Sequence, residues 1–260
     1  MRRGCEGRSR GRGTTRKHIT SLSQVSVGHT PLVVSDLSLS TPDGARTLFV
    51  NVSATINRGE HLLITGPSGV GKSSMLRAIA GLWGAGSGEI QRPPTERTMF
   101  LPQRPYCAIG TLRQQLLYPR DDSDVGDEQL LDALRAVRMG NLATRLAATD
   151  GGSGLDAARD WTEMLSLGEQ QRLCFARLIV NRPALAILDE ASSALDLTNE
   201  ARMYEALHAH VPDLTVISIG HRPSLRRFHA MQLHFTAAES AASPATAKLN
   251  RIEIDELETL

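Results

Sequence analysis

The chain has 260 residues, of which 41% are hydrophobic and 22% charged, enough apolar material for one sizeable core or a core with a small attached lobe. Lysine plus arginine number 29 and aspartate plus glutamate number 28, and this balance gives no reason to expect nucleic acid as a partner. The three cysteines lack metal-ligand or disulfide spacing, and no apolar run reaches the roughly 18 residues of a membrane-spanning helix.

The first 30 residues predict a disordered basic tail or linker. Residues 1–17 hold six arginines and one lysine against a single glutamate, and residues 1–30 show no periodic apolar pattern. An arginine-rich, acid-poor segment also suits an organelle transit peptide. A plain tail, or a linker left from a longer protein, is the simpler interpretation.

The segment that follows predicts strands leading into a glycine-rich turn. Strand-like patterns at residues 31–40 and 47–56 are separated by the turn Pro42-Asp43-Gly44. A short apolar strand at 61–65 then runs into a glycine-rich loop and a helix at about 71–82. Another strand is expected at 98–101.

From residue 111 the pattern becomes helical, and residues 127–139 carry apolar side chains at helical spacing with charges between them. We expect a helical lobe at about 110–182, inserted into an α/β core. Later elements are predicted as helices at 168–180, at 196–210 and after His221, and as strands at 184–188, 215–219 and 231–235. Alternating strands and helices favour a mainly parallel sheet covered on both faces. Residues 237–260 predict a polar C-terminal tail.

The segment Gly66-Pro67-Ser68-Gly69-Val70-Gly71-Lys72-Ser73 fits the P-loop pattern G-x-x-x-x-G-K-[ST], between a predicted strand and a predicted helix. Glycines let the backbone wrap around phosphates with its N–H groups pointing inward, and the helix start adds its positive end. Lys72 can reach the β- and γ-phosphates, and the Ser73 hydroxyl can ligate Mg²⁺. Ser74 follows in the same nucleotide-binding segment.

A second motif is an apolar strand that ends in two acids, Leu185-Ala186-Ile187-Leu188-Asp189-Glu190. Its carboxyl end delivers both carboxylates to the crevice where α/β proteins bind ligands. Asp189 suits the Mg²⁺ shell, and Glu190 can orient and deprotonate an attacking water. Kinases, GTPases and helicases also combine a P-loop with an acidic strand end, so these two motifs leave the class open.

A third motif, Leu165-Ser166-Leu167-Gly168-Glu169-Gln170-Gln171-Arg172, decides the class. Ser166 is expected at the N-cap of an amphipathic helix with Gly168 in its first turn, so a hydroxyl and free N–H groups form a second anion site. The segment resembles the signature motif of ABC ATPases, with the common L-S-G-G-Q replaced by L-S-L-G-E. The resemblance implies that four residues, Ser166, Leu167, Gly168 and Glu169, close over the γ-phosphate of the ATP that is bound to a partner subunit.

The resemblance covers residues 31–235 and implies roles for three further residues. Gln103 matches the Q-loop glutamine, which contacts Mg²⁺ and couples to the membrane domain. Asp196 matches the D-loop aspartate at the dimer interface, and His221 matches the switch histidine that contacts the γ-phosphate. The implied fold is that of an α/β P-loop NTPase of the ABC ATPase type in residues 31–236. It has a mainly parallel sheet core, N-terminal antiparallel strands and an inserted helical lobe.

Several segments look like ABC subfamily D and its bacterial relatives, at residues 100–106, 117–119, 165–177, 221–225 and 228–229. These proteins are half-transporters with a membrane domain fused before the nucleotide domain, and they carry fatty acyl-CoA, cobalamin, peptides or vitamins. One departure is Thr41, which stands where most ABC ATPases stack an aromatic residue on adenine. A second is the missing membrane domain, which we expect on another chain unless this chain is a truncated product.

The resemblance implies an ATPase that binds ATP and Mg²⁺, pairs with a second nucleotide-binding domain and drives transport. Glu190, Gln103 and His221 are its expected catalytic residues, and Ser73, Gln103 and Asp189 its expected metal ligands. We expect membrane association through a transmembrane partner, in a peroxisomal or other organelle membrane or a bacterial inner membrane. The alternative is a soluble ABC ATPase that acts on nucleic acid or ribosomes.

Overall fold

The computed structural model of the chain describes residues 22–26, 32–120, 124–237 and 243–252. The strands are β1 (Ser23–Ser26), β2 (Leu32–Ser40), β3 (Thr47–Ile56), β4 (His61–Thr65), β5 (Gly86–Arg92), β6 (Thr98–Leu101), β7 (Ile109–Thr111), β8 (Ala158–Asp160), β9 (Leu185–Asp189), β10 (Thr215–Ile219), β11 (Met231–Thr236) and β12 (Thr246–Arg251). The helices are α1 (Lys72–Ala80), α2 (Leu112–Leu117), α3 (Asp127–Ala136), α4 (Gly140–Asp150), α5 (Trp161–Met164), α6 (Leu167–Asn181) and α7 (Leu197–His210), with 3-10 turns η1 (Thr95–Arg97) and η2 (Pro223–Phe228).

A six-stranded sheet, in the order β12-β11-β4-β10-β9-β6, forms the centre of the molecule. Every neighbouring pair is parallel except β11 with β12, so the prediction of a mainly parallel sheet is confirmed. Strands buried on both faces need apolar side chains at every position. In β4, Leu62 and Ile64 contribute to one core and Leu63 to the other, as the two-residue period of a strand requires.

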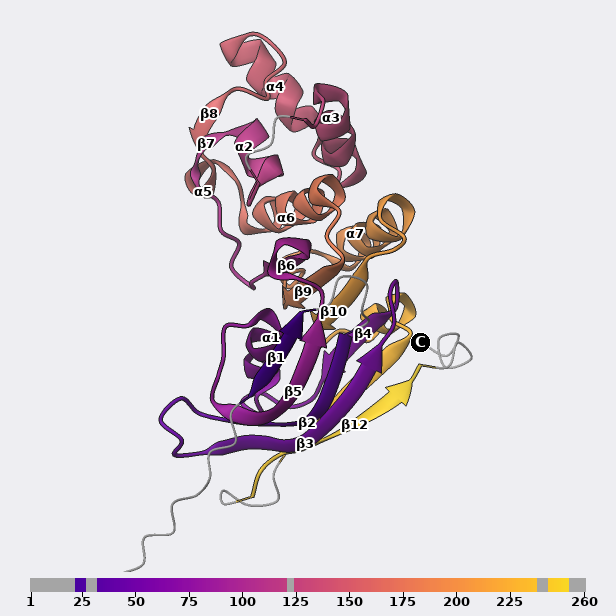
Figure 1. Cartoon of the computed structure of the whole chain (residues 1–260). Coiled ribbons are helices and arrows are strands. Elements are labelled where there is room, and N and C mark those ends of the chain that lie inside the picture. Colours follow the sequence, from indigo (N-terminus) through magenta and orange to yellow (C-terminus); the bar gives the residue numbers. More distant parts are fainter. Residues whose placement is uncertain (1–21, 27–31, 121–123, 238–242, 253–260) are drawn as a thin grey trace, which may run out of the picture.

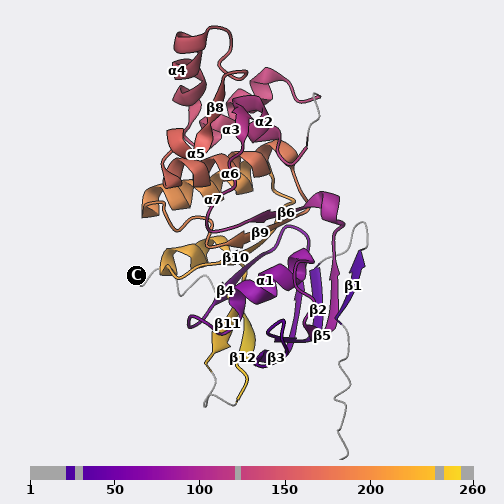
Figure 2. The ribbon, with the colours of Figure 1, turned by 90° about the vertical axis from the view of Figure 1, so that its left-hand side faces the viewer.

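One core lies between this sheet and a four-stranded sheet, in the order β1-β5-β2-β3, in which β2 pairs antiparallel with both β3 and β5. Figure 2 shows α1 between the two sheets. Its buried Met75, Leu76 and Ile79 pack into the cluster that contains the apolar side chains of both sheets. Phe49 of β3 meets Phe235 of β11 edge to face at 5.2 Å. The predicted antiparallel N-terminal strands are therefore present.

The other core lies on the opposite face of the six-stranded sheet, where α6 and α7 cover it and α2, α3 and α4 form the outer lobe (Figure 1). Here α6 lies between the sheet and the lobe, and its Phe175 is fully buried. Trp161 is also fully buried, and its indole Nε1 donates to the Gly110 carbonyl at 2.8 Å. The expected helical lobe thus forms around α6 rather than as a detached bundle.

Two strands that the sequence did not predict, β1 and β12, lie toward the two ends of the chain. Residues 23–26, expected within a disordered tail, form β1, which pairs in parallel with β5. Residues 246–251, expected within a polar tail, form β12, so the strand at 231–235 is not the last one. Leu22 is also described, and the other residues of the predicted N-terminal tail, 1–21 and 27–30, lie outside the described part. In these strands, backbone pairing outweighs side chains that are largely polar.

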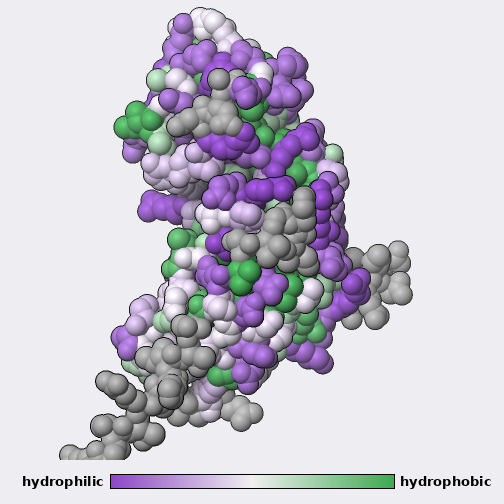
Figure 3. Space-filling model, in the orientation of Figure 1, coloured by the Kyte–Doolittle hydropathy of each residue, from purple (hydrophilic) through white to green (hydrophobic). Residues whose placement is uncertain are grey.

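In the described part of the chain, no helix is long and apolar enough to cross a membrane. The face drawn in Figure 3 is mostly hydrophilic, and its apolar patches are separated rather than joined into one broad area.

Candidate nucleotide-binding and catalytic site

The loop between β4 and α1 has the backbone of a phosphate-binding turn. Gly66, Gly69 and Gly71 have φ angles of 129°, 77° and 103°, which residues with a Cβ rarely adopt. A Cβ on Gly66 would lie 2.4 Å from the Phe235 carbonyl oxygen, so β11 itself excludes any larger residue there. The start of α1 has no side-chain cap, which leaves backbone N–H groups free for an anion.

Lys72 lies inside this loop. Its ammonium donates to the carbonyls of Gly66 at 2.8 Å and Pro67 at 2.7 Å, and the residue is only 7% exposed. Burial lowers the pKa of Lys72, while the charges of Glu190 and Asp189 act in the opposite direction. A bound polyphosphate would add negative charge to that of the two carboxylates and further offset the burial of the ammonium.

Ser73 and Asp189 form a pair of oxygen ligands between α1 and the end of β9. The Ser73 hydroxyl donates to Asp189 Oδ1 at 2.8 Å. Burial raises the pKa of Asp189, and the hydrogen bond from Ser73 partly offsets it. A hydroxyl beside a carboxylate is the hard oxygen donor set that Mg²⁺ prefers, so the two residues fit the expected metal.

Glu190, Gln103 and His221 meet at the carboxyl ends of three adjacent parallel strands, β9, β6 and β10. The Gln103 amide donates to Glu190 Oε2 at 3.0 Å, and His221 Nε2 lies 3.1 Å from Glu190 Oε1. Glu190 has a φ of 53°, a left-handed conformation that costs a residue of this kind about 1 kcal/mol or more. The structure therefore brings the three predicted catalytic residues together around one carboxylate.

Ser166 is the N-cap of α6, as predicted, and forms a reciprocal capping box with Glu169. The Ser166 hydroxyl accepts from the Glu169 N–H at 3.3 Å and donates to its carboxylate at 2.8 Å. Leu167 is 45% exposed, and a Cβ on Gly168 would lie 3.3 Å from the Ala194 carbonyl. The start of α6 therefore lies against the segment 193–196.

The helices that follow the P-loop and the signature segment, α1 and α6, pack in different cores. Figures 1 and 2 both show α6 and α1 on opposite sides of the six-stranded sheet, in agreement with their different cores. Asp196, the remaining predicted site residue, caps α7 by accepting from the Asn199 N–H at 2.7 Å. That backbone hydrogen bond is the main cause of its lowered pKa.

Two residues near the site, Gln171 and Arg222, make contacts that their motifs do not predict. Gln171 is fully buried, donates to the Gln103 carbonyl at 3.2 Å and accepts from the Ala194 N–H at 2.9 Å. Arg222, which follows His221, donates to two carbonyls of the segment 193–196. Two features of the sequence could have indicated a role for these residues. Gln171 lies on the inner face of a predicted helix, and Arg222 follows a site residue directly.

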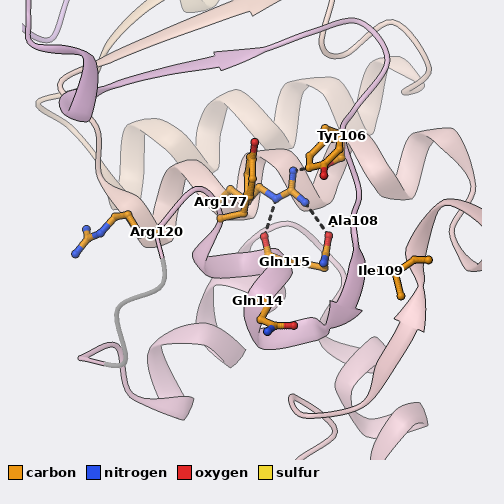
Figure 4. A pocket seen from close by; sticks show the side chains of 8 residues that line it. Tyr106, Ala108, Ile109, Gln114, Gln115, Arg120 and Arg177 are labelled. Atoms are coloured by element: carbon orange, nitrogen blue, oxygen red, sulfur yellow. Dashed lines mark hydrogen bonds between the residues drawn. The ribbon is translucent and has the colours of Figure 1, made fainter.

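A pocket of about 170 Å³ opens three residues beyond Gln103, and Figure 4 shows its lining. Tyr106, Ile109 and Tyr118 are 57%, 78% and 44% exposed at its edge. Arg177 is buried beneath them, with its guanidinium 5.3 Å from the centre of the Tyr118 ring. It donates to the carbonyls of Tyr106 and Gln115, each at 2.7 Å. The buried arginine holds this partly apolar rim in place.

The sequence profile described as ABC transporter matches residues 49–193, which include the P-loop, the signature segment and the acidic strand end. The chain belongs to the ABC transporter family. It is accordingly an ATP-binding and ATP-hydrolysing domain of the ABC type, and the ABC ATPase fold expected from its motifs is confirmed.

Individual relatives of this ABC domain include subfamily D proteins, as the motifs indicated. An uncharacterized ABC transporter ATP-binding protein from Synechocystis is 50% identical over 79% of this chain and 30% of its own length. The chloroplastic ABC transporter D family member 2 of Arabidopsis thaliana is 38% identical, over 85% of this chain and 37% of its own. A human lysosomal cobalamin transporter is 38% identical, over 78% and 34%.

The chain spans about a third of the length of these relatives. Among solved structures, a bacterial Atm1-family ABC exporter with ATP bound superposes with a TM-score of 0.69 at 24% identity. The match covers 82% of this chain and 38% of the other. At that identity the likeness concerns the fold alone.

Proposed function

We propose that this ABC domain hydrolyses ATP within a head-to-tail dimer and so drives a membrane domain to transport a substrate. The observation that carries the proposal is the convergence of Gln103 and His221 on Glu190, next to the Ser73–Asp189 pair. We assign the nucleotide-binding domain to residues 31–236, with the helical lobe at about 110–182. The strands β1 and β12 add to its sheet edges.

Dimerisation follows from the separation of the two anion sites. Each ATP would lie between the P-loop of one domain and the segment Ser166, Leu167, Gly168 and Glu169 of a second copy or a homologous domain. The P-loop and the signature segment begin helices that pack in different cores, α1 and α6, and we take them as two separate anion sites that would share one nucleotide only across an interface between two domains. The neighbouring segment 193–196, with Asp196, would lie across the same interface.

In the proposed reaction, the backbone N–H groups of segment 66–74, Pro67 excepted, and the Lys72 ammonium bind the phosphates. Ser73, Asp189 and Gln103 would hold Mg²⁺, which neutralises charge developing on the phosphate oxygens when it is bound. Glu190 accepts the proton of the water that attacks the γ-phosphate. Gln103 and His221, which now contact Glu190, would exchange that contact for the nucleotide, so hydrolysis would release both and favour opening of the dimer.

The pocket beside the Q-loop supports a membrane partner. Tyr106 and Tyr118 expose large side chains around it, and a short segment joins Tyr106 to Gln103. A partner helix seated there would be connected through this segment to the Glu190 carboxylate. The membrane in question would be that of an organelle, such as the peroxisome, or a bacterial inner membrane.

The test compares Glu190→Gln with Lys72→Ala in the purified domain. Glu190→Gln removes the proton acceptor, so ATP turnover should fall by about a hundredfold or more while ATP still binds and a dimer accumulates on gel filtration. Lys72→Ala should weaken ATP binding itself. Glu205→Gln, an exposed position on α7, is the matched control and should keep full turnover.

Undiminished ATP hydrolysis in Glu190→Gln would refute the assignment of the catalytic base. Purification with bound nucleic acid or ribosomes, in place of a membrane protein, would favour the alternative of a soluble ABC ATPase.

A further inference from the structure

Arg222 connects the loop of the switch histidine to the segment 193–195. One guanidinium nitrogen donates to the Leu195 carbonyl at 2.7 Å and the other terminal nitrogen donates to the Ser193 carbonyl at 3.1 Å. The planar fork of arginine can hold two carbonyls at once in a fixed geometry, which the single ammonium of lysine cannot do. The two loops are thereby fixed to each other by one side chain.

A buried carboxylate completes this contact. Glu200, on α7, is 2% exposed, and its Oε1 lies 3.4 Å from the Arg222 guanidinium. Its oxygens also accept from Ser192 at 2.6 Å and Ser224 at 3.4 Å. A buried carboxylate needs a cation and hydrogen-bond donors to offset the loss of water. Glu200 therefore holds the Arg222 side chain in the orientation that reaches both carbonyls.

This network borders the catalytic carboxylate. Glu190, His221, Glu200 and Arg222 all line one pocket of about 90 Å³. The His221 side chain is half exposed, and its contact with Glu190 spans 3.1 Å. The position of the imidazole therefore depends on its backbone, which the next residue, Arg222, fixes to the segment 193–195.

We infer that Arg222 is a positioning residue, with Glu200 as its counter-charge, that makes the histidine loop and the segment 193–195 move as one unit. The inference rests on the proposed function, in which segment 193–196 contacts the second domain. Closure of the dimer at that segment would then place His221 and Glu190 for reaction. Arg222 would act on the rate of hydrolysis and not on the affinity of the P-loop for ATP.

The test measures kcat and KM for ATP in Arg222→Lys and Arg222→Gln, with Arg202→Gln at an exposed site of α7 as the control. A displacement of about 1 Å in a catalytic group can cost about a hundredfold in rate. We expect kcat to fall by about that factor in both variants, with KM changed by less than about threefold. Arg222→Lys retains a cation beside Glu200 and should keep the wild-type melting temperature within a few degrees.

Wild-type kcat in Arg222→Lys, or a rise in KM with kcat unchanged in Arg222→Gln, would overturn the inference. If neither variant folds, Glu200→Gln decides, because its amide oxygen can still accept from Ser192 while its NH2 group donates to the Ser224 hydroxyl. We expect about a tenfold fall in kcat at constant KM there, and an unchanged kcat would overturn the inference. Failure of the proposed function is distinguishable, since it would appear as absent turnover in the wild-type protein.

Discussion

A cluster of three histidines, two of them buried, should make the folding stability of this domain sensitive to mild acid. His61 begins β4, His208 lies near the end of α7, and His229 follows η2. The His61 ring lies 4.4 Å from that of His208 and 5.9 Å from that of His229, centre to centre. Burial is the main cause that lowers the pKa of His61 to about 4 and that of His229 to about 3, from 6.5.

Both pKa values lie below that of the unfolded chain, so the unfolded state binds protons first as the pH falls. The stability is complete above pH 6.5 and is lost progressively toward the folded-state values of about 4 and about 3. Each histidine then contributes a loss of about 1.4 kcal/mol per pH unit, or about 2 kcal/mol at pH 5. Together the two amount to about 4 kcal/mol, a large part of the roughly 5–15 kcal/mol of a typical domain.

The assay is urea unfolding of the purified domain at pH 7.5, 6.5, 5.5 and 5.0 at constant ionic strength. The free energy of unfolding should fall by about 4 kcal/mol across this range, and His229→Phe should lose about half of that dependence. His210→Gln removes an exposed histidine from the end of the same helix as His208 and serves as the control. A fall of less than about 1 kcal/mol in the wild-type protein would refute the reasoning.

Two further substitutions test the turn and the cap. Gly66→Ala places a Cβ 2.4 Å from the Phe235 carbonyl oxygen at a φ of 129°. We therefore expect the free energy of unfolding to fall by about 2 kcal/mol or more in thermal unfolding, and ATP binding to weaken in a fluorescent-nucleotide titration. An unaltered melting temperature would contradict this expectation. Ser166→Ala removes the N-cap of α6 and should cost about 1 kcal/mol in urea unfolding. The same variant should also reduce ATP-dependent dimerisation, and normal dimerisation would remove Ser166 from the proposed interface.

The parts of the fold that the sequence predicts well are strands marked by apolar side chains. The predicted bounds of β3, β4, β6 and β10 agree with the structure, and those of β9 differ by one residue. In β4, β9 and β10, burial on both faces demands an unbroken apolar run, whereas β3 alternates buried and exposed positions along much of its length. In contrast, β5 has the sequence Gly-Ser-Gly-Glu-Ile-Gln-Arg, and only Ile90 contributes an apolar side chain to the core. Its formation depends on pairing with β2, which no local pattern reveals.

The candidate site divides in the same way. Lys72, Asp189, Glu190 and His221 stand in motifs whose residue types carry the chemistry, so their positions were predictable. The hydrogen bonds of Arg222 go to backbone carbonyls, which every residue possesses. Contacts of that kind leave no residue-type signal on the partner segment, and only the folded geometry shows them.

The left-handed backbone of Glu190 has a consequence for copies of the protein that lose this residue. Replacement by glycine would relieve about 1 kcal/mol of conformational cost while removing the carboxylate. Inactive copies would then be at least as well folded as active ones and would escape the quality control that removes unstable chains. In a dimer of the proposed kind, inactive copies would persist in the cell and pair with active ones. One defective allele would then lower the activity of dimers that also contain the product of the intact allele.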